Sequence, residues 1–161
     1  MEAIEIQAPN KLEDDGRLKV FLAGSIEMGK AEDWQKKCIT ELADYPIQFI
    51  NPRRDDWDSS WEQTIENKQF NEQVTWELDS LEKSTFIIMY FDPATKSPIS
   101  LLELGVHACC NPEKLLVLCP EGFWRKGNVD IVCERYGVTM VKDFDELISL
   151  FKTKIVYLQY E

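Results

Sequence analysis

The sequence predicts an α/β domain with a parallel five-stranded sheet and helices on both of its faces. Two observations support this fold class. Short apolar runs alternate along the chain with longer segments of helical periodicity, which is typical of parallel strands joined by helices. The segment 84–92, "STFIIMYFD", contains an unbroken apolar run, as expected for a strand covered on both faces.

Five segments carry the strand pattern. The first, 18–24 ("LKVFLAG"), ends in glycine, and the second, 47–52 ("IQFINP"), is halted by its proline. The third is the buried segment 84–92. Two further apolar runs, 114–120 ("KLLVLCP") and 138–141 ("VTMV"), complete the expected sheet.

Helices are expected between and after these strands. They are 31–45, 62–82, a helix that begins at Ser97, 128–137 and 143–154. In the first of them Trp34, Cys38 and Leu42 share one side, as in a helix that packs on a sheet. The fourth ends at a glycine, which suits a helix C-terminus.

The chain has 161 residues, 44% hydrophobic and 29% charged, which suits one globular domain with a substantial core. Residues 1–17 are acidic and lack the pattern of a signal peptide, so we expect a partly ordered leader before a single domain at 18–161. The longest apolar run near the middle, "FIIMYF", is far shorter than the roughly 20 residues that span a bilayer. No membrane partner is therefore expected.

The net charge is −11, from 29 acidic and 18 basic residues. This balance argues against binding to nucleic-acid polymers, which requires cations against the phosphates. It leaves room for a small nucleoside in a local pocket.

The five cysteines form no CxxC pair, and their number is odd. We expect reduced, mostly buried thiols in a cytoplasmic protein. The sequence "HACC" brings His107 near Cys109 and Cys110, but no second ligand pair exists, so no metal site is predicted.

Parallel sheets of this class place their sites at the carboxyl ends of the strands. Polar or small residues follow those ends at Gly24-Ser25, at Asn51 to Arg54, at Asp92-Pro93 and at Pro120. We expect the functional site along this edge.

The stretch "SPISLLELGVHA" (97–108) sets a carboxylate among apolar residues. We expect Ser97 to be the N-cap of a helix and Pro98 its first residue. The predicted apolar face contains Ile99, Leu102, Val106 and Cys110. Helical spacing places Glu103 on that same face, where a lone carboxylate is costly.

The preceding helix repeats the pattern. Its predicted apolar face contains Phe70, Val74, Leu78 and Leu81. Glu77 lies three residues after Val74 and belongs to this face. Two such glutamates suit glycosyl chemistry, with one as nucleophile and one as proton donor. The alternative is structural: Glu103 pairs with His107 or binds backbone amides.

Four segments together resemble the nucleoside 2-deoxyribosyltransferase-like family: "VFLAGSIEMGKAEDWQ", "INPRRDDW", "NEQVTWELDSLEKSTFIIMYF" and "SPISLLELG". The resemblance implies a flavodoxin-like, or Rossmann-like, sheet and a retaining glycosyl transfer. It implies that Glu103 is the nucleophile and that Glu77 assists the leaving base. It also implies that Gly24 and Ser25 lie beneath the sugar and base.

The family further lends an asparagine from a neighbouring subunit to the sugar. The corresponding residue here is Asn128, which implies a homodimer or a larger homo-oligomer. The alternative is that Asn128 caps the helix that follows. The family also carries an aspartate shortly before the nucleophile, where this chain has "ATKSPIS"; Asp92, eleven residues before Glu103, is a candidate sugar or base ligand.

Related nucleoside-monophosphate hydrolases have basic residues after "GSI", whereas Glu27 follows it here, which favours an unphosphorylated nucleoside. Arg53 and Arg54 could reverse this preference as a phosphate clamp, or they pair with Asp55 and Asp56.

Trp57, with Trp61, could stack on a bound base, the alternative being ordinary packing.

The sequence therefore predicts an enzyme that cleaves the N-glycosidic bond of nucleosides, above all 2′-deoxynucleosides, through a covalent ester on Glu103. A free nucleobase accepts the sugar in transfer, and water accepts it in hydrolysis. No metal or organic cofactor is expected. Alternative functions are hydrolysis of nucleoside 5′-monophosphates and a catalytically silent nucleotide-binding module.

Overall fold

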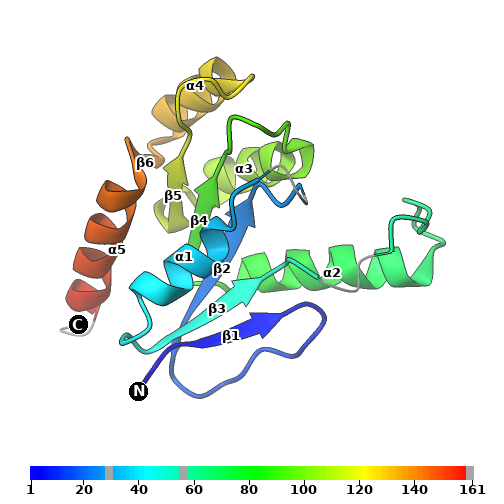
Figure 1. Ribbon diagram of the computed structural model, residues 1–161, viewed down its shortest axis with the longest axis horizontal. Helices are drawn as coiled ribbons and strands as arrows, with labels where there is room; N and C mark the ends of the chain where they lie inside the picture. The colour runs from blue at the N-terminus through cyan, green and yellow to red at the C-terminus, as the bar shows by residue number, and fades with distance from the viewer. Residues whose placement is uncertain (28–30, 55–57, 159–161) are drawn as a thin grey trace.

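The computed structural model describes residues 1–27, 31–54 and 58–158 and has a Rossmann-like α/β fold (Figure 1). Its sheet contains β1 (Ile4–Gln7), β2 (Leu18–Gly24), β3 (Ile47–Asn51), β4 (Phe86–Tyr90), β5 (Leu115–Leu118) and β6 (Thr139–Val141). The strands have the spatial order β1-β3-β2-β4-β5-β6, and every pair is parallel. The predicted parallel α/β fold is confirmed.

The prediction of five strands was wrong, because the sheet has six. The extra strand, β1, comes from the segment expected to be a leader, and Ile4 to Gln7 pair with Gln48 to Asn51 of β3. Its sequence, "IEIQ", has only two apolar residues, and only Ile6 is fully buried. An edge strand that is half solvated carries too weak a pattern to be recognised.

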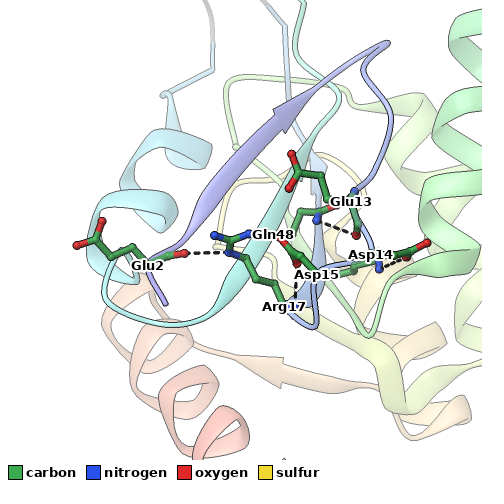
Figure 2. Close-up of polar contacts among 7 residues, drawn as sticks. Glu2, Glu13, Asp14, Asp15, Arg17 and Gln48 are labelled. Carbon is green, nitrogen blue, oxygen red and sulfur yellow. Dashed lines mark hydrogen bonds and ion pairs between the residues drawn. The ribbon is translucent and has the colours of Figure 1, made fainter.

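Hydrogen bonds attach the leader to β3 and also join its two ends to each other, as Figure 2 shows. The backbone N–H of Glu13 donates to Oε1 of Gln48 at 3.0 Å, and Nε2 of Gln48 donates to the Glu13 carbonyl at 3.1 Å. Nε of Arg17 donates to the carbonyl of Glu2 at 3.0 Å, and its guanidinium pairs with Asp15. Residues 1–17 are therefore part of the packed structure.

Within the described ranges, five helices cover the sheet: α1 (Trp34–Glu41), α2 (Lys68–Lys83), α3 (Pro98–Cys110), α4 (Lys126–Tyr136) and α5 (Phe144–Leu158), with a 3-10 turn at Pro112–Lys114. The helices α1 and α5 pack on one face through residues such as Trp34 and Phe151. The helices α2, α3 and α4 pack on the other face through Leu81, Leu104 and Val129. Each face has its own apolar core.

Without β1, the remaining strands counted from β2 have the order 2-1-3-4-5, which is the flavodoxin-like order. In that order the connections diverge between the first and third strands, here β2 and β4. Ligands of such sheets bind outside the carboxyl ends of these two strands. The topology therefore points to the ends at Gly24 and Tyr90.

The long helix was expected from residue 62, but α2 begins only at Lys68. Asn67 is its N-cap, and Oδ1 of Asn67 accepts the backbone N–H of Phe70 at 3.0 Å. The cap satisfies an amide of the first turn and fixes where the helix starts.

Ser97 is the N-cap residue of α3, as predicted, but it does not cap the helix through its side chain. Its backbone is left-handed (φ 45°, ψ 54°), and its side chain makes no capping hydrogen bond. Its hydroxyl lies instead in a buried cluster, 2.6 Å from Oγ of Ser25 and 2.8 Å from Oγ1 of Thr95. Pro98 is the first residue of the helix, as predicted.

The predicted core faces of α2 and α3 were wrong in part. On α3, Ile99, Leu102 and Val106 are 59%, 66% and 51% exposed, and Cys110 is exposed. The buried residues of α3 are Ser100, Leu104, His107 and Ala108. On α2, Leu78 is exposed, whereas Gln73, Ser80 and Leu81 are buried. Small side chains let these helices approach the sheet, and apolar periodicity alone does not identify such a face.

Candidate active site

The two predicted catalytic residues, Glu77 and Glu103, lie on α2 and α3, respectively. Both helices pack over the same face of the sheet. Both side chains are partly buried. Burial, and then the negative charge of Glu77, raise the pKa of Glu103 to about 8. Burial also raises the pKa of Glu77, and a hydrogen bond from Gln73 opposes that rise. The pair therefore holds a proton at neutral pH.

Glu103 lies at the margin of the buried face of α3 rather than at its centre. The buried residues Ser100 and His107 lie three positions before it and four after it. The exposed residues Ile99 and Val106 lie on its other side. The predicted apolar stripe faces solvent, yet Glu103 is still desolvated, and the charge of Glu77 on α2 acts on it.

The structural alternative for Glu103 was a pair with His107. Within the described part of the chain no hydrogen bond or ion pair joins them, and Nδ1 of His107 has no partner there. Burial, and then Lys114, lower the pKa of His107, while Glu82 acts in the opposite direction. A neutral imidazole does not stabilise the Glu103 anion.

Gln73 connects Glu77 to the end of β3 and was not predicted as a site residue. Nη1 of Arg54 donates to Oε1 of Gln73 at 3.1 Å, and Nε2 of Gln73 donates to Oε1 of Glu77 at 2.7 Å. The sequence contained one signal for it, since Gln73 lies four residues before Glu77 on the same helix.

Gly24 and Ser25 lie at the end of β2, in direct contact with β4. Gly24 has φ +131°, and a Cβ added to it would lie 2.3 Å from the Tyr90 carbonyl oxygen. The backbone N–H of Ser25 donates to that oxygen at 2.9 Å, and Oγ of Ser25 accepts the Asp92 N–H at 2.9 Å. The neighbouring strand therefore requires a small residue at Gly24 before any ligand is considered.

Asp92 ties together two loops at the same edge. Its Oδ2 accepts the backbone N–H of Glu32 at 3.0 Å, and its Oδ1 accepts that of Ala94 at 2.8 Å. The side chain is buried. Asp92 thus joins the segment just before α1 to the loop after β4.

Glu27 reaches the N-terminus of α3. Its Oε1 accepts the backbone N–H groups of Lys96 at 2.8 Å and Ser97 at 3.1 Å. Amides at a helix N-terminus favour an anion, and here the chain supplies its own.

Both arginines after β3 bind glutamines. Nη2 of Arg53 donates to Oε1 of Gln35 at 3.3 Å, and Arg54 donates to Gln73 as described. The guanidinium of Arg54 also lies over the ring of Trp61, 5.3 Å from its centroid. Their suggested partners Asp55 and Asp56, and the candidate stacking residue Trp57, lie outside the described residues.

Asn128 is exposed on the first turn of α4 and does not cap that helix, whose N-cap is Arg125. It lines a cavity of about 310 Å³ between α3 and α4, together with Leu101, Gly105 and Trp124. Glu103 does not line this cavity.

The described ranges contain no cluster of three or more His, Cys, Asp or Glu side chains that could hold a metal ion. In the same part of the chain no helix is both long and apolar enough to cross a membrane.

Comparison with known proteins identifies a family for most of the chain. The sequence model of the family described as "Nucleoside 2-deoxyribosyltransferase like" matches residues 17–123. This region contains both Glu77 and Glu103, and it excludes β1 and Asn128. No curated protein matches the chain. Because the family match covers well over half of its length, the chain belongs to the nucleoside 2-deoxyribosyltransferase-like family.

Proposed function

We propose that the protein cleaves the N-glycosidic bond of nucleosides, with 2′-deoxynucleosides as its main substrates, through a covalent glycosyl ester on Glu103. The observation that carries this proposal is the pair of partly buried glutamates, Glu77 and Glu103, whose charges interact. A nucleophile and a proton donor side by side are what retaining glycosyl transfer requires.

In the first step a Glu103 oxygen attacks C1′ as the C1′–N bond breaks. The bonding electrons move to the base nitrogen, and the proton on Glu77 neutralises the leaving base. In the second step a nitrogen of another base, or water, attacks C1′ and breaks the ester. The carboxylate of Glu103 is restored, and Glu77 takes the proton from the attacking group.

The mutual repulsion of the carboxylates suits this cycle. Since both cannot easily be ionised together, the pair keeps one proton over the neutral range. In the free protein the higher pKa keeps that proton on Glu103, and the reaction requires its transfer to Glu77, which leaves the negative charge on Glu103.

Glu27 supports an unphosphorylated nucleoside as the substrate. Glu103 lies in the second turn of α3, and helical side chains lean toward the N-terminus, so a sugar held at Glu103 extends toward Lys96 and Ser97. The carboxylate of Glu27 already occupies those two amides. A 5′-phosphate would meet this negative charge rather than free N–H groups.

A second copy of the chain is the partner that we propose for the exposed face of α3. Ile99, Leu102 and Val106 form an apolar stripe beside Glu103, and soluble monomers rarely leave such a stripe uncovered. In a symmetric dimer the same patch covers itself on both subunits. Such a dimer would also supply Asn128 from the partner subunit.

The test is incubation with a 2′-deoxynucleoside and a different free base, followed by chromatography. A new nucleoside supports transfer, and release of free base alone supports hydrolysis. Cleavage only of 5′-monophosphates would replace our proposal with the nucleotide hydrolase. If no nucleoside or nucleotide reacts, the remaining function is that of a catalytically silent nucleotide-binding module.

A further inference from the structure

We propose that Gln73 is a positioning residue that orients the carboxyl group of Glu77 toward the leaving base and separates it from the charge of Arg54. The proposal rests on the proposed function, in which Glu77 delivers a proton to the base. It is carried by three groups in a row, the Arg54 guanidinium, the Gln73 amide and the Glu77 carboxyl.

The chemistry of the row fixes the orientation of the Gln73 amide. Arg54 has only donors, so the Gln73 atom 3.1 Å from its Nη1 must be the oxygen. The amide nitrogen then faces Oε1 of Glu77 at 2.7 Å. The flipped amide would set an NH₂ group against the guanidinium.

This orientation decides which Glu77 oxygen can carry the acidic proton. Oε1 accepts the N–H of Gln73, so a proton on Glu77 is placed on Oε2. Gln73 is buried, and its Nε2 also lies 3.5 Å from the Pro52 carbonyl. A side chain packed and bonded in this way holds Glu77 in one rotamer, which is the preorganisation that proton transfer needs.

Gln73 also keeps a full positive charge from direct contact with Glu77. A guanidinium bonded to the carboxylate would stabilise its anion and favour loss of the proton. Arg54 holds the neutral amide of Gln73 in place, and the amide in turn holds the Glu77 carboxyl group, so that Arg54 is not bonded to the carboxyl group through this amide. Burial accordingly raises the pKa of Glu77, and the only opposing cause is the hydrogen bond from Gln73.

The experiment compares two leaving groups in wild type and in Gln73→Met, which has a similar volume and no N–H. The first substrate is a 2′-deoxynucleoside that wild type cleaves. The second is 7-methyl-2′-deoxyguanosine, whose base already carries a positive charge and leaves without a proton. We expect Gln73→Met to lower kcat about 10-fold on the first substrate and less than about twofold on the second.

The matched control is Gln48→Met, another buried glutamine that holds the leader at Glu13. It should reduce stability without distinguishing the two substrates. If Gln73→Met does not fold, Gln73→Leu provides the same comparison. In a Glu77→Gln background, loss of Gln73 should have no further effect on the ratio of the two rates.

An equal loss on both substrates, or no loss, overturns the role of Gln73 while the proposed function stands. A wild-type protein that cleaves neither substrate nor any other nucleoside overturns the proposed function and this inference together.

Discussion

The negative charge of Glu77 helps to raise the pKa of Glu103, so the two glutamates behave as one titrating pair. They come from helices separated by β4 in the sequence, and only the packing of α2 and α3 on one face of the sheet brings them together. The chemistry of the site depends on this packing.

Replacement of Glu103 by glutamine should abolish turnover and preserve the fold. Glutamine cannot form the ester, so we expect a loss of at least about 1,000-fold in kcat. Chromatography of the reaction and circular dichroism measure the two properties. Glu134→Gln, on the exposed side of α4, removes the same charge and should keep full activity. Turnover that survives in Glu103→Gln would assign the nucleophile elsewhere.

In wild type, kcat/KM should fall above about pH 8, because the glutamate pair loses its last proton there and Glu77 can no longer act as an acid. Glu77→Gln removes the charge that raises the pKa of Glu103. In that variant the descending limb should disappear and kcat on ordinary bases should fall about 100-fold. Profiles from pH 5 to 10 measure both effects, and an unchanged limb in the variant contradicts the assignment.

Glu103 should destabilise the folded protein as the pH rises. Its pKa is raised from 4.5 to about 8, so the folded state retains a proton that the unfolded state has lost between these values. Its contribution to stability is thus favourable at low pH and decreases across this window. The free energy of unfolding of Glu103→Gln, relative to that of wild type, should therefore be about 1 kcal/mol higher at pH 8 than at pH 5.

Urea denaturation of both proteins at the two pH values measures this gain. The comparison with wild type cancels other titrating groups, such as His107. A difference that does not depend on pH would mean that Glu103 ionises normally.

Glu27→Gln should weaken the preference of the protein for a nucleoside over the corresponding nucleoside 5′-monophosphate. Removing the negative charge at the Lys96 and Ser97 amides should raise kcat/KM for a nucleoside 5′-monophosphate about 10-fold relative to the nucleoside. Competition between the two substrates in one reaction measures the ratio. Glu134→Gln again serves as the control of equal charge, and an equal change in both variants would point to net charge instead.

Leu102→Lys should dissociate the proposed dimer, because it places a charge in the apolar stripe of α3. Analytical ultracentrifugation should show a shift from dimer to monomer. Ile65→Lys alters another exposed apolar residue, which lies outside that stripe, and should leave the assembly unchanged. A wild-type protein that is monomeric at all concentrations contradicts the dimer.

The central strands could be predicted because they are buried on both faces, which leaves continuous apolar runs such as "FIIMY" in β4. The strand β1 could not, since an edge strand needs few apolar residues. Helical spacing placed both glutamates on core-facing sides, and both are partly buried, although the predicted apolar stripe of α3 faces solvent.

Gln73 could not be recognised from the sequence. Its role depends on Arg54, which is 19 residues away in the chain and comes near only after folding. Candidate reactive side chains can therefore be picked out from the sequence, whereas hydrogen bonds between distant segments, such as those of Gln73, appear only in the structure.

The strand β1 limits how far the N-terminus of this protein can be truncated. The region shared with the family begins at residue 17, so a protein trimmed to that boundary would lack β1 and leave the outer edge of β3 unpaired. It would also lose the Asn10 carbonyl, which accepts the indole N–H of Trp76 at 2.8 Å, next to Glu77. The segment before residue 17 thus contacts both β3 and the turn of α2 that contains Glu77, so its removal should disturb the structure next to that glutamate.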